Sequence, residues 1–187
     1  LADALGSVVC DVAIEPPLMP LQGEAVSGSS ADGARVDIRA RGFWTRQQNA
    51  FFDVRVTHPR PSLLSGPEVA GQLSQHERQK KRQYADRINQ VDRGSFTPLV
   101  FATNGQSAPE CSRFLKTLAA RIADKNRDLQ YALVLGHLRS RISTSLIRWQ
   151  ITCFRGSRSS YARGVSGTGR HGFVTECRAL AHMSRVQ

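Results

Sequence analysis

The stretch from Ala34 to Pro59 constrains the fold more than any other part of the sequence. It reads as two alternating strands joined by a short polar connection, and strands that are this close in sequence usually pair antiparallel. Because side chains along a strand point alternately to its two faces, each half of the stretch has one polar face and one apolar face. The pattern therefore predicts an antiparallel hairpin with one face in the core.

Each predicted strand carries one aspartate. In the first strand, residues 35–41, Asp37 alternates with apolar neighbours, so we expect Asp37 on the polar face and Val36, Ile38 and Ala40 on the other. The polar face of this strand also carries arginines. The first strand thus predicts a carboxylate on the side of the hairpin that faces away from the apolar core.

The second strand, residues 51–58, places Asp53 and Arg55 on one face. In an antiparallel hairpin, these two side chains and Asp37 then lie on the same side of the sheet. One interpretation is a solvated face on which carboxylates pair with arginines, each pair contributing under about 1 kcal/mol. The other is that the two carboxylates hold a divalent cation, for which carboxylate oxygens are preferred ligands.

Periodicity along the rest of the chain predicts one domain with helices on a small sheet. The expected elements are the end of a helix over 1–9, strands over 12–21, 35–41 and 51–58, a helix over 73–91, a strand over 95–103, and helices over 110–125 and 129–149. This order is typical of a mixed α/β (α+β) domain with a mixed sheet of about four strands flanked by helices. The continuous apolar run of 95–103 predicts a central strand, although Pro98 interrupts it.

We assign residues 1–154 to this domain, since 187 residues correspond to about one domain. Residues 155–187 begin with a basic run rich in Arg, Gly and Ser that lacks the apolar residues needed for packing. We therefore predict that they form a disordered tail. The chain opens on Leu1 rather than methionine, so we expect further residues upstream.

The helix over 73–91 carries charged side chains on its own apolar stripe. At about 100° per residue, Glu77 and Lys80 fall on the same side as Leu73 and Ile88. An ordinary ion pair at the rim of the stripe would account for this, with a contribution of a few tenths of a kcal/mol. Alternatively, the stripe passes over a polar site at this point.

Phosphodiester hydrolysis needs a divalent cation, a water made nucleophilic, and positive charge beside the developing oxyanion. Asp37 and Asp53 are the candidate metal ligands. Arginine stays protonated in proteins, so Arg55 can hold a phosphate but cannot activate a water. A lysine can do so when burial or a neighbouring cation lowers its pKa, and Lys80 is therefore the candidate for this role.

The remaining titratable residues exclude several kinds of site. The four cysteines and five histidines are scattered without metal-binding or redox spacing, which argues against a zinc ribbon and fits a reducing compartment. Glu15 and Glu77 are secondary candidates for metal or water contacts, and His58 and His76 are expected to be structural or exposed. No apolar run approaches the roughly 18 residues of a membrane span, and no signal peptide is visible.

Basic residues concentrate in the C-terminal third. Residues 1–130 hold 17 Lys and Arg against 14 Asp and Glu, whereas 131–187 hold nine Arg and one acid. The net charge of +11 favours a polyanion partner, most often a nucleic acid, although a GC-rich gene would also raise the arginine content. The residues that we assign to nucleic-acid contact are Lys81, Arg82, Arg139, Arg141 and Arg148.

Together these residues resemble the PD-(D/E)XK restriction-like nucleases. Asp37, then an Asp-Val-Arg strand from Asp53, then a helix with Lys80 four residues before Tyr84 look like the version at the C-terminus of site-specific non-LTR retrotransposon proteins. The strings AFFDVRV, KKRQY and FTPLVFATNG look like domains that adjoin reverse transcriptases. The resemblance covers about residues 1–158.

The resemblance implies a restriction-endonuclease-like core and a Mg²⁺-dependent (or Mn²⁺-dependent) endonuclease that nicks target DNA during retroelement insertion. It implies Asp37 and Asp53 as metal ligands, with Arg55 and Lys80 completing the catalytic set. It further implies a reverse transcriptase domain upstream, a nuclear location, and retroelement RNA as a second candidate ligand beside DNA.

The sequence departs from the family pattern at three positions. Val36 stands where the family has proline, Arg55 replaces the usual lysine, and Gln83 occupies the second lysine position of the helix motif. The alternative function is therefore a catalytically dead, nucleic-acid-binding remnant of the same fold. A decayed retroelement fragment without function is the third hypothesis.

Overall fold

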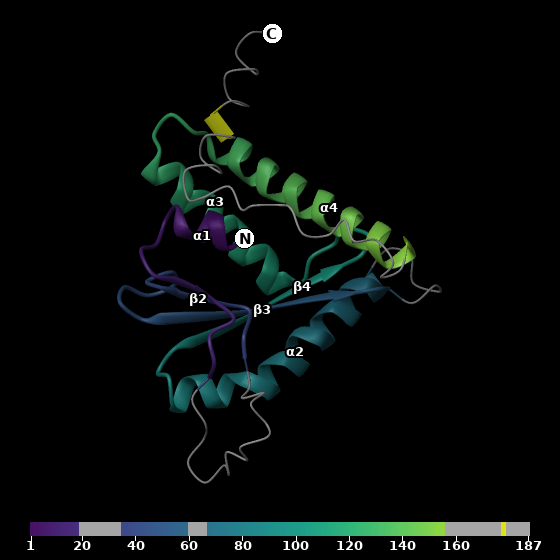
Figure 1. Ribbon diagram of the computed structural model, residues 1–187, viewed down its shortest axis with the longest axis horizontal. Helices are drawn as coiled ribbons and strands as arrows, with labels where there is room; N and C mark the ends of the chain where they lie inside the picture. Colours follow the sequence, from purple (N-terminus) through teal and green to yellow (C-terminus); the bar gives the residue numbers. More distant parts are fainter. Residues whose placement is uncertain (19–34, 60–66, 156–176, 179–187) are drawn as a thin grey trace.

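The computed structural model describes residues 1–18, 35–59, 67–155 and 177–178 (Figure 1). Its elements are α1 (Ala2–Gly6), β1 (Val12–Ile14), β2 (Ile38–Arg41), β3 (Asn49–Thr57), α2 (Pro67–Gln90), β4 (Ser95–Ala102), α3 (Pro109–Lys125) and α4 (Tyr131–Arg155). The order of helices and strands is the predicted one. The fold class, a mixed α+β domain with a four-stranded mixed sheet flanked by helices, is confirmed.

The sheet has the strand order β1-β2-β3-β4. The predicted hairpin forms, because β2 pairs antiparallel with β3 and sets Ile38 opposite Phe52. β1 extends the sheet antiparallel to β2, whereas β4 pairs parallel with β3. Parallel neighbours need a crossover connection, and α2 provides it between β3 and β4.

Helices cover both faces of the sheet: α2 lies against one, and α3 and α4 lie on the other (Figure 1). The main core fills the side of α3 and α4. Its centre is a group of three rings, Phe43, Phe52 and Phe114, whose centroids lie 4.8–5.4 Å apart. Contacts of this kind add stability beyond the burial of the rings themselves.

The α2 face holds two smaller apolar clusters, one near each end of the helix. Tyr84 and Ile88 pack into a cluster with Phe51 and Phe96, and Leu73 lies in a separate cluster with other residues of α2 and β4. Between these clusters, the middle of α2 meets the sheet through polar side chains. The candidate site lies in this gap.

The predicted alternation of the first strand is wrong across Asp37. Val36 packs into the α2-side cluster, whereas Ile38 and Ala40 belong to the core on the α3 side. The reason is a bend at Asp37, just before β2 begins at Ile38. There the Asp37 side chain, rather than a longer β2 backbone, accepts the N–H of Val54.

The predicted central position of the strand over 95–103 is also wrong. β4 lies at the edge of the described sheet, with β3 as its neighbour on one side. An edge strand tolerates proline because one of its sides needs no ladder donor, which accounts for Pro98. The strand is buried from Phe96 onward because α2 covers one of its faces and α3 the other.

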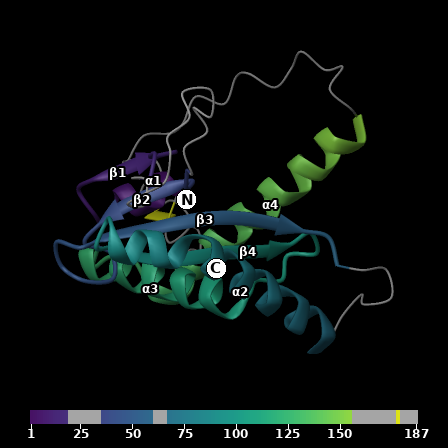
Figure 2. The same ribbon diagram turned by 90° about the horizontal axis from the view of Figure 1, so that it is seen from below.

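Other boundaries differ in length rather than kind. α2 begins at Pro67 rather than 73, since proline suits the first turn of a helix, and α4 continues to Arg155. Of the predicted strand 12–21, the structure has Val12–Ile14 as β1, and residues 19–21 lie outside the described ranges. Figure 2 shows the distal half of α4 projecting from the sheet, where Phe154 is 88% exposed.

Two residues of the predicted tail pack against the domain. Cys177 is buried in the main core, and Arg178 Nε lies 2.6 Å from Asp128 Oδ2. The packed unit therefore includes residues beyond 154, and Arg155 belongs to α4, while the predicted disorder of residues 156–176 and 179–187 lies outside the described residues. Within the described ranges, no helix combines the length and apolar character that a membrane crossing requires.

Candidate active site

Lys80 of α2 reaches the aspartate of β3. Its Nζ lies 2.8 Å from Asp53 Oδ2, and the two side chains are 19% and 8% exposed. The contact forms in the polar gap between the two apolar clusters of the α2 face. The charged interruption of the helix stripe therefore marks the place where α2 passes over Asp53.

The Asp53 carboxyl lies in an environment that resists ionisation. Burial is the largest influence and raises its pKa, and the hydrogen bond and charge of Lys80 offset part of this effect. The charge of Asp37 raises the pKa of Asp53 further, and Arg55 lowers it. Asp37 and Arg55 are therefore close enough to Asp53 to act on its charge, and the net direction is upward.

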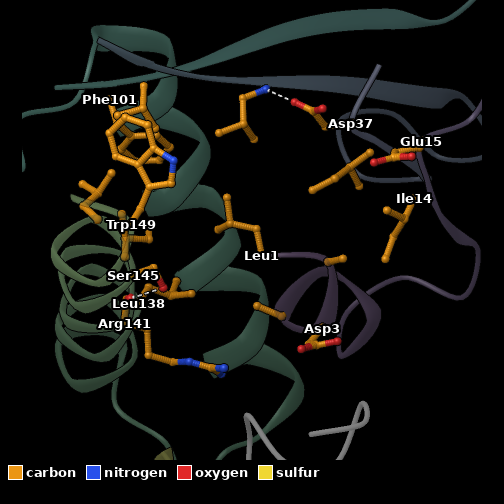
Figure 3. A pocket seen from close by; sticks show the side chains of 17 residues that line it. Leu1, Asp3, Ile14, Glu15, Asp37, Phe101, Leu138, Arg141, Ser145 and Trp149 are labelled. Carbon is orange, nitrogen blue, oxygen red and sulfur yellow. Dashed lines mark hydrogen bonds between the residues drawn. The ribbon is translucent and has the colours of Figure 1, made fainter. Parts of the chain in front are cut away.

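Asp37 approaches β3 from a different side than predicted. Its Oδ2 accepts the backbone N–H of Val54 at 2.5 Å, and the half-buried side chain lines a cavity on the α4 side of the sheet together with Val54 and Val56 (Figure 3). Asp53, in contrast, faces α2. The prediction that Asp37, Asp53 and Arg55 share one side is wrong, because the bend at Asp37 breaks the alternation.

The cavity beside Asp37 has a volume of about 510 Å³ and mostly apolar walls. Figure 3 shows Asp37 and Glu15 on one side of it and Trp149 with Phe101 on the other. Sequence reasoning did not find this cavity, because α1, β1, the sheet and α4 build it from segments far apart in the chain. Periodicity marks each wall as apolar but does not show that the walls enclose a space.

Asp37 and Asp53 face different sides of the sheet, but the charge of Asp37 acts on Asp53, so the two carboxylates lie near each other across the hairpin. The Oδ2 atom of each carboxylate has a partner within the protein, Val54 N–H for Asp37 and Lys80 for Asp53. In the part of the chain that the structure describes, no group of three or more His, Cys, Asp or Glu residues gathers. Two carboxylates suit Mg²⁺, which keeps several waters and binds phosphate oxygens.

Arg55 lies on the same face of β3 as Asp53. Its Nη1 donates to Gln79 Oε1 at 2.9 Å, which ties the guanidinium to α2 one position before Lys80. Burial, and then the charge of Arg55, lower the pKa of His76, whose Nε2 lies 3.3 Å from Thr57 Oγ1. Arg55 is thus a half-exposed cation beside the carboxylate and within reach of an anion that approaches Asp53.

Lys80 also contacts the aromatic ring of Tyr84, on the same helix. The ring centroid of Tyr84 lies 5.3 Å from Lys80 Nζ, within the range of a cation–π contact. Tyr84 in turn packs on Phe96 of β4, with 5.5 Å between the centroids. The lysine therefore lies between a carboxylate and a ring that the α2-side cluster fixes. Sequence reasoning selected Tyr84 by spacing alone.

The secondary candidates have other contacts. Glu77 is buried and its carboxylate accepts the backbone N–H of Glu110, in the first turn of α3. Glu15 is exposed and its N–H donates to the carbonyl of Asp37 at 2.9 Å. His58 Nδ1 lies 2.8 Å from Thr103 Oγ1. These contacts give Glu77 and His58 a structural explanation, whereas the contact of Glu15 involves its backbone.

The predicted nucleic-acid residues do not form one surface. α2 carries Lys81, which pairs with Glu110 at 2.5 Å, and the exposed Arg82. α4 carries the exposed Arg139 and Arg148 and the half-buried Arg141, which lines the cavity. Because α2 and α4 cover opposite faces of the sheet, a duplex that contacts one group faces away from the other (Figure 1).

Comparisons of the chain with protein-family profiles, curated proteins and solved structures found no match.

Proposed function

We propose that the chain is a metal-dependent endonuclease domain that nicks DNA by phosphodiester hydrolysis, of the restriction-like kind found in non-LTR retroelements. The observation that carries the proposal is the 2.8 Å contact between Lys80 Nζ and Asp53 Oδ2. A buried carboxylate paired with a lysine from a separate helix is an unfavourable arrangement unless other contacts or a function retain it. The charges of Arg55 and Asp37 also act on this carboxyl, with Arg55 on the same side of the sheet and Asp37 on the other.

In the proposed reaction, Asp37 and Asp53 would hold Mg²⁺ or Mn²⁺. The cation would neutralise the phosphate and make a bound water more acidic. Lys80 Nζ would orient the attacking water, whose proton would pass to the solvent, and the Tyr84 ring keeps the lysine side chain in place. The P–O bond to the departing oxygen would break as the new P–O bond forms, and that oxygen would take a proton from a second water. Arg55 turns from Gln79 to the non-bridging oxygens of the phosphate, where its charge stabilises the transition state.

The partners follow from the same proposal. DNA is the substrate, retroelement RNA is a second ligand, and a reverse transcriptase domain lies upstream in a nuclear protein. The net charge of +11 supports a polyanion partner, because a positively charged protein attracts the phosphate backbone independently of base sequence.

A plasmid-nicking assay tests the proposal. Supercoiled DNA with Mg²⁺ or Mn²⁺ should convert to open circles with the wild-type protein, and Asp53→Ala should lower the rate at least about 100-fold, as removal of a metal ligand does. Asp86→Ala removes an exposed carboxylate of α2 and should leave the rate unchanged. Equal cutting by Asp53→Ala and wild type would refute the proposal.

One observation favours the alternative of a non-catalytic nucleic-acid-binding domain. α4 contains four arginines and no acid over its 25 residues, and Arg139 and Arg148 are exposed. Such a helix can bind phosphates without Asp37 or Asp53. Salt-sensitive DNA binding without cleavage, unchanged in Asp37→Ala and Asp53→Ala, would support this second function.

A further inference from the structure

The first turn of α3 has no cap of its own. Its N-cap residue is Ala108, which makes no side-chain cap hydrogen bond, and Pro109 at the first helical position has no N–H to donate. The backbone N–H groups of Glu110 and Cys111 remain at the helix start, where a buried donor without an acceptor is costly. Another element must therefore supply the acceptor.

Glu77 of α2 supplies it. Its side chain is 6% exposed, its Oε1 lies 2.9 Å from the backbone N of Glu110, and the carboxylate also accepts from the backbone of Cys111. Burial raises the pKa of Glu77, and these two hydrogen bonds oppose the effect. A carboxylate at this end of a helix also gains from the helix dipole.

A second contact joins the same two turns. Lys81, one helical turn after Glu77, pairs through its Nζ with Glu110 Oε1 at 2.5 Å. α2 therefore holds the first turn of α3 at two points, one through the backbone and one through a side chain. Glu77 and Lys81 bracket Lys80, which points to Asp53 instead.

Apolar packing does not fix this part of α2. The apolar contacts of the helix involve Val69 and Leu73 toward one end and Tyr84 and Ile88 toward the other. Between these clusters, the side chains of α2 that meet the rest of the domain are polar. The contact of Glu77 with α3 is the most buried of these polar contacts that is independent of the candidate site.

We infer that Glu77 is a positioning residue, which fixes α2 against the start of α3 so that Lys80 Nζ meets Asp53. The catalytic part of this inference rests on the proposed function, whereas the dependence of the Lys80–Asp53 contact on Glu77 does not. In this proposal Glu77 is not a metal ligand, because its carboxylate accepts hydrogen bonds from two backbone N–H groups.

Three variants and a control separate the possibilities. Glu77→Ala removes the acceptor, Glu77→Gln keeps an oxygen acceptor without the charge, and Glu77→Asp keeps the charge but shortens the side chain by one methylene. The last variant covers the case in which Glu77→Ala does not fold. Asp86→Ala, an exposed carboxylate of the same helix, is the matched control.

Two measurements do not need nuclease activity. Amide hydrogen exchange at Glu110 and Cys111 reports the cap, and NMR of lysine ammonium groups reports the ion pair of Lys80. The chain has four lysines, at positions 80, 81, 116 and 125, so Lys80→Arg assigns the Lys80 signal. We expect Glu77→Ala and Glu77→Asp to accelerate exchange at least tenfold and to abolish the Lys80 signal, and Glu77→Gln to retain both.

Nicking kinetics add the catalytic readout. Glu77→Ala or Glu77→Asp should lower kcat at least tenfold with KM changed less than twofold, and Glu77→Gln should recover most of the rate. Faster exchange at Glu110 and Cys111 with an unchanged Lys80 signal would overturn the inference. If the cap and the Lys80 signal disappear together in a chain that never nicks DNA, the positioning role stands and the proposed function fails.

Discussion

At the scale of single residues, Asp53 shows the conflict between function and stability most clearly. Its carboxyl is buried under Lys80, and its pKa is raised by burial despite that ion pair. Residues that are retained at such a cost to folding are typical of functional sites. Replacement of the charge should therefore separate activity from stability.

We predict that Asp53→Asn abolishes nicking and raises the melting temperature at pH 8 by about 2–4 °C, which corresponds to about 1 kcal/mol in a chain of this size. Because the pKa of Asp53 is raised in the folded chain, the stability that this carboxyl contributes is present at low pH and is lost as pH rises through the folded pKa. The gain from Asp53→Asn should thus shrink as pH falls toward the ordinary range of Asp.

Calorimetry of both proteins across pH checks this prediction. Asp86→Asn, an exposed carboxylate of α2, should melt like the wild type at each pH. A lower melting temperature for Asp53→Asn than for wild type at pH 8 would mean that the ion pair with Lys80 contributes more than burial costs.

Replacement of two glycines by alanine should change the free energy of unfolding in opposite directions. A Cβ at Gly94 would lie 2.7 Å from a ring carbon of Phe51 and 2.8 Å from the backbone oxygen of Asn49. Gly94→Ala should therefore destabilise the fold by about 1–3 kcal/mol through overpacking. At Gly71, inside α2, the added atom meets nothing within 4 Å, so Gly71→Ala should stabilise by about 0.5–1 kcal/mol.

Urea unfolding of the two variants and the wild type measures both effects with the same m-value expected throughout. Similar midpoints for Gly94→Ala and wild type would show that the start of β4 moves away from Phe51 at little cost. A destabilised Gly71→Ala would show that α2 is less regular at that turn than its geometry suggests.

At the scale of elements, local sequence predicted which helices and strands form but not every contact that ends or exposes them. The order of elements followed from periodicity, and α3 begins within one residue of its expected start. The start of β2 did not, because a side chain–backbone bond from Asp37 to Val54 decides it. Pro98 indicated that β4 lies at the edge of the sheet, but the apolar run around it led to the prediction of a central strand.

In the candidate site, too, the sequence predicted some positions and not others. The interrupted stripe of α2 correctly located Lys80 over the sheet, because helical periodicity is a local property. Glu77 lay on the same stripe, yet its contact with Glu110 depends on how two helices meet, which no local pattern encodes. The side from which Asp37 approaches could not be predicted for the same reason.

α4 carries a prediction at this scale. Arg139 and Arg148 are exposed on a helix without acids, on the face of the sheet opposite α2 (Figure 1). The double variant Arg139→Ala/Arg148→Ala should weaken DNA binding and reduce the slope of log K against log salt by about 0.9 for each phosphate that is no longer neutralised. Turnover at saturating DNA should stay within twofold, because Lys80 and Asp53 lie on the other face.

Binding titrations at several salt concentrations measure the slope, and Arg82→Ala serves as the comparison on α2. An unchanged slope in the α4 double variant combined with a reduced slope in Arg82→Ala would place the DNA on the α2 face instead. Either result assigns one of the two basic faces to the nucleic acid.

At the scale of the whole molecule, the sheet carries two different environments. The face toward α3 and α4 has a continuous apolar core, whereas the face toward α2 has two apolar clusters separated by a charged gap. Asp53 lies in that gap, and Asp37 lies at the bend just before β2 begins. A cation held by both carboxylates would therefore link β3 to the segment that precedes β2.

Such a cation would bind the folded chain and not the unfolded one, so it should raise the melting temperature. With free Mn²⁺ at 100 times its Kd, linkage gives about 2.7 kcal/mol of added stability. Asp37→Asn should abolish this shift while it keeps the hydrogen bond from Val54, because an amide oxygen accepts the same N–H. Asp11→Asn, which alters a carboxylate paired with Arg39 at 3.2 Å outside the site, should keep the shift. Melting curves with Mn²⁺ and with EDTA decide between these outcomes. An equal shift in Asp37→Asn and wild type would place the cation elsewhere, and no shift in the wild type would remove the metal from the proposed mechanism.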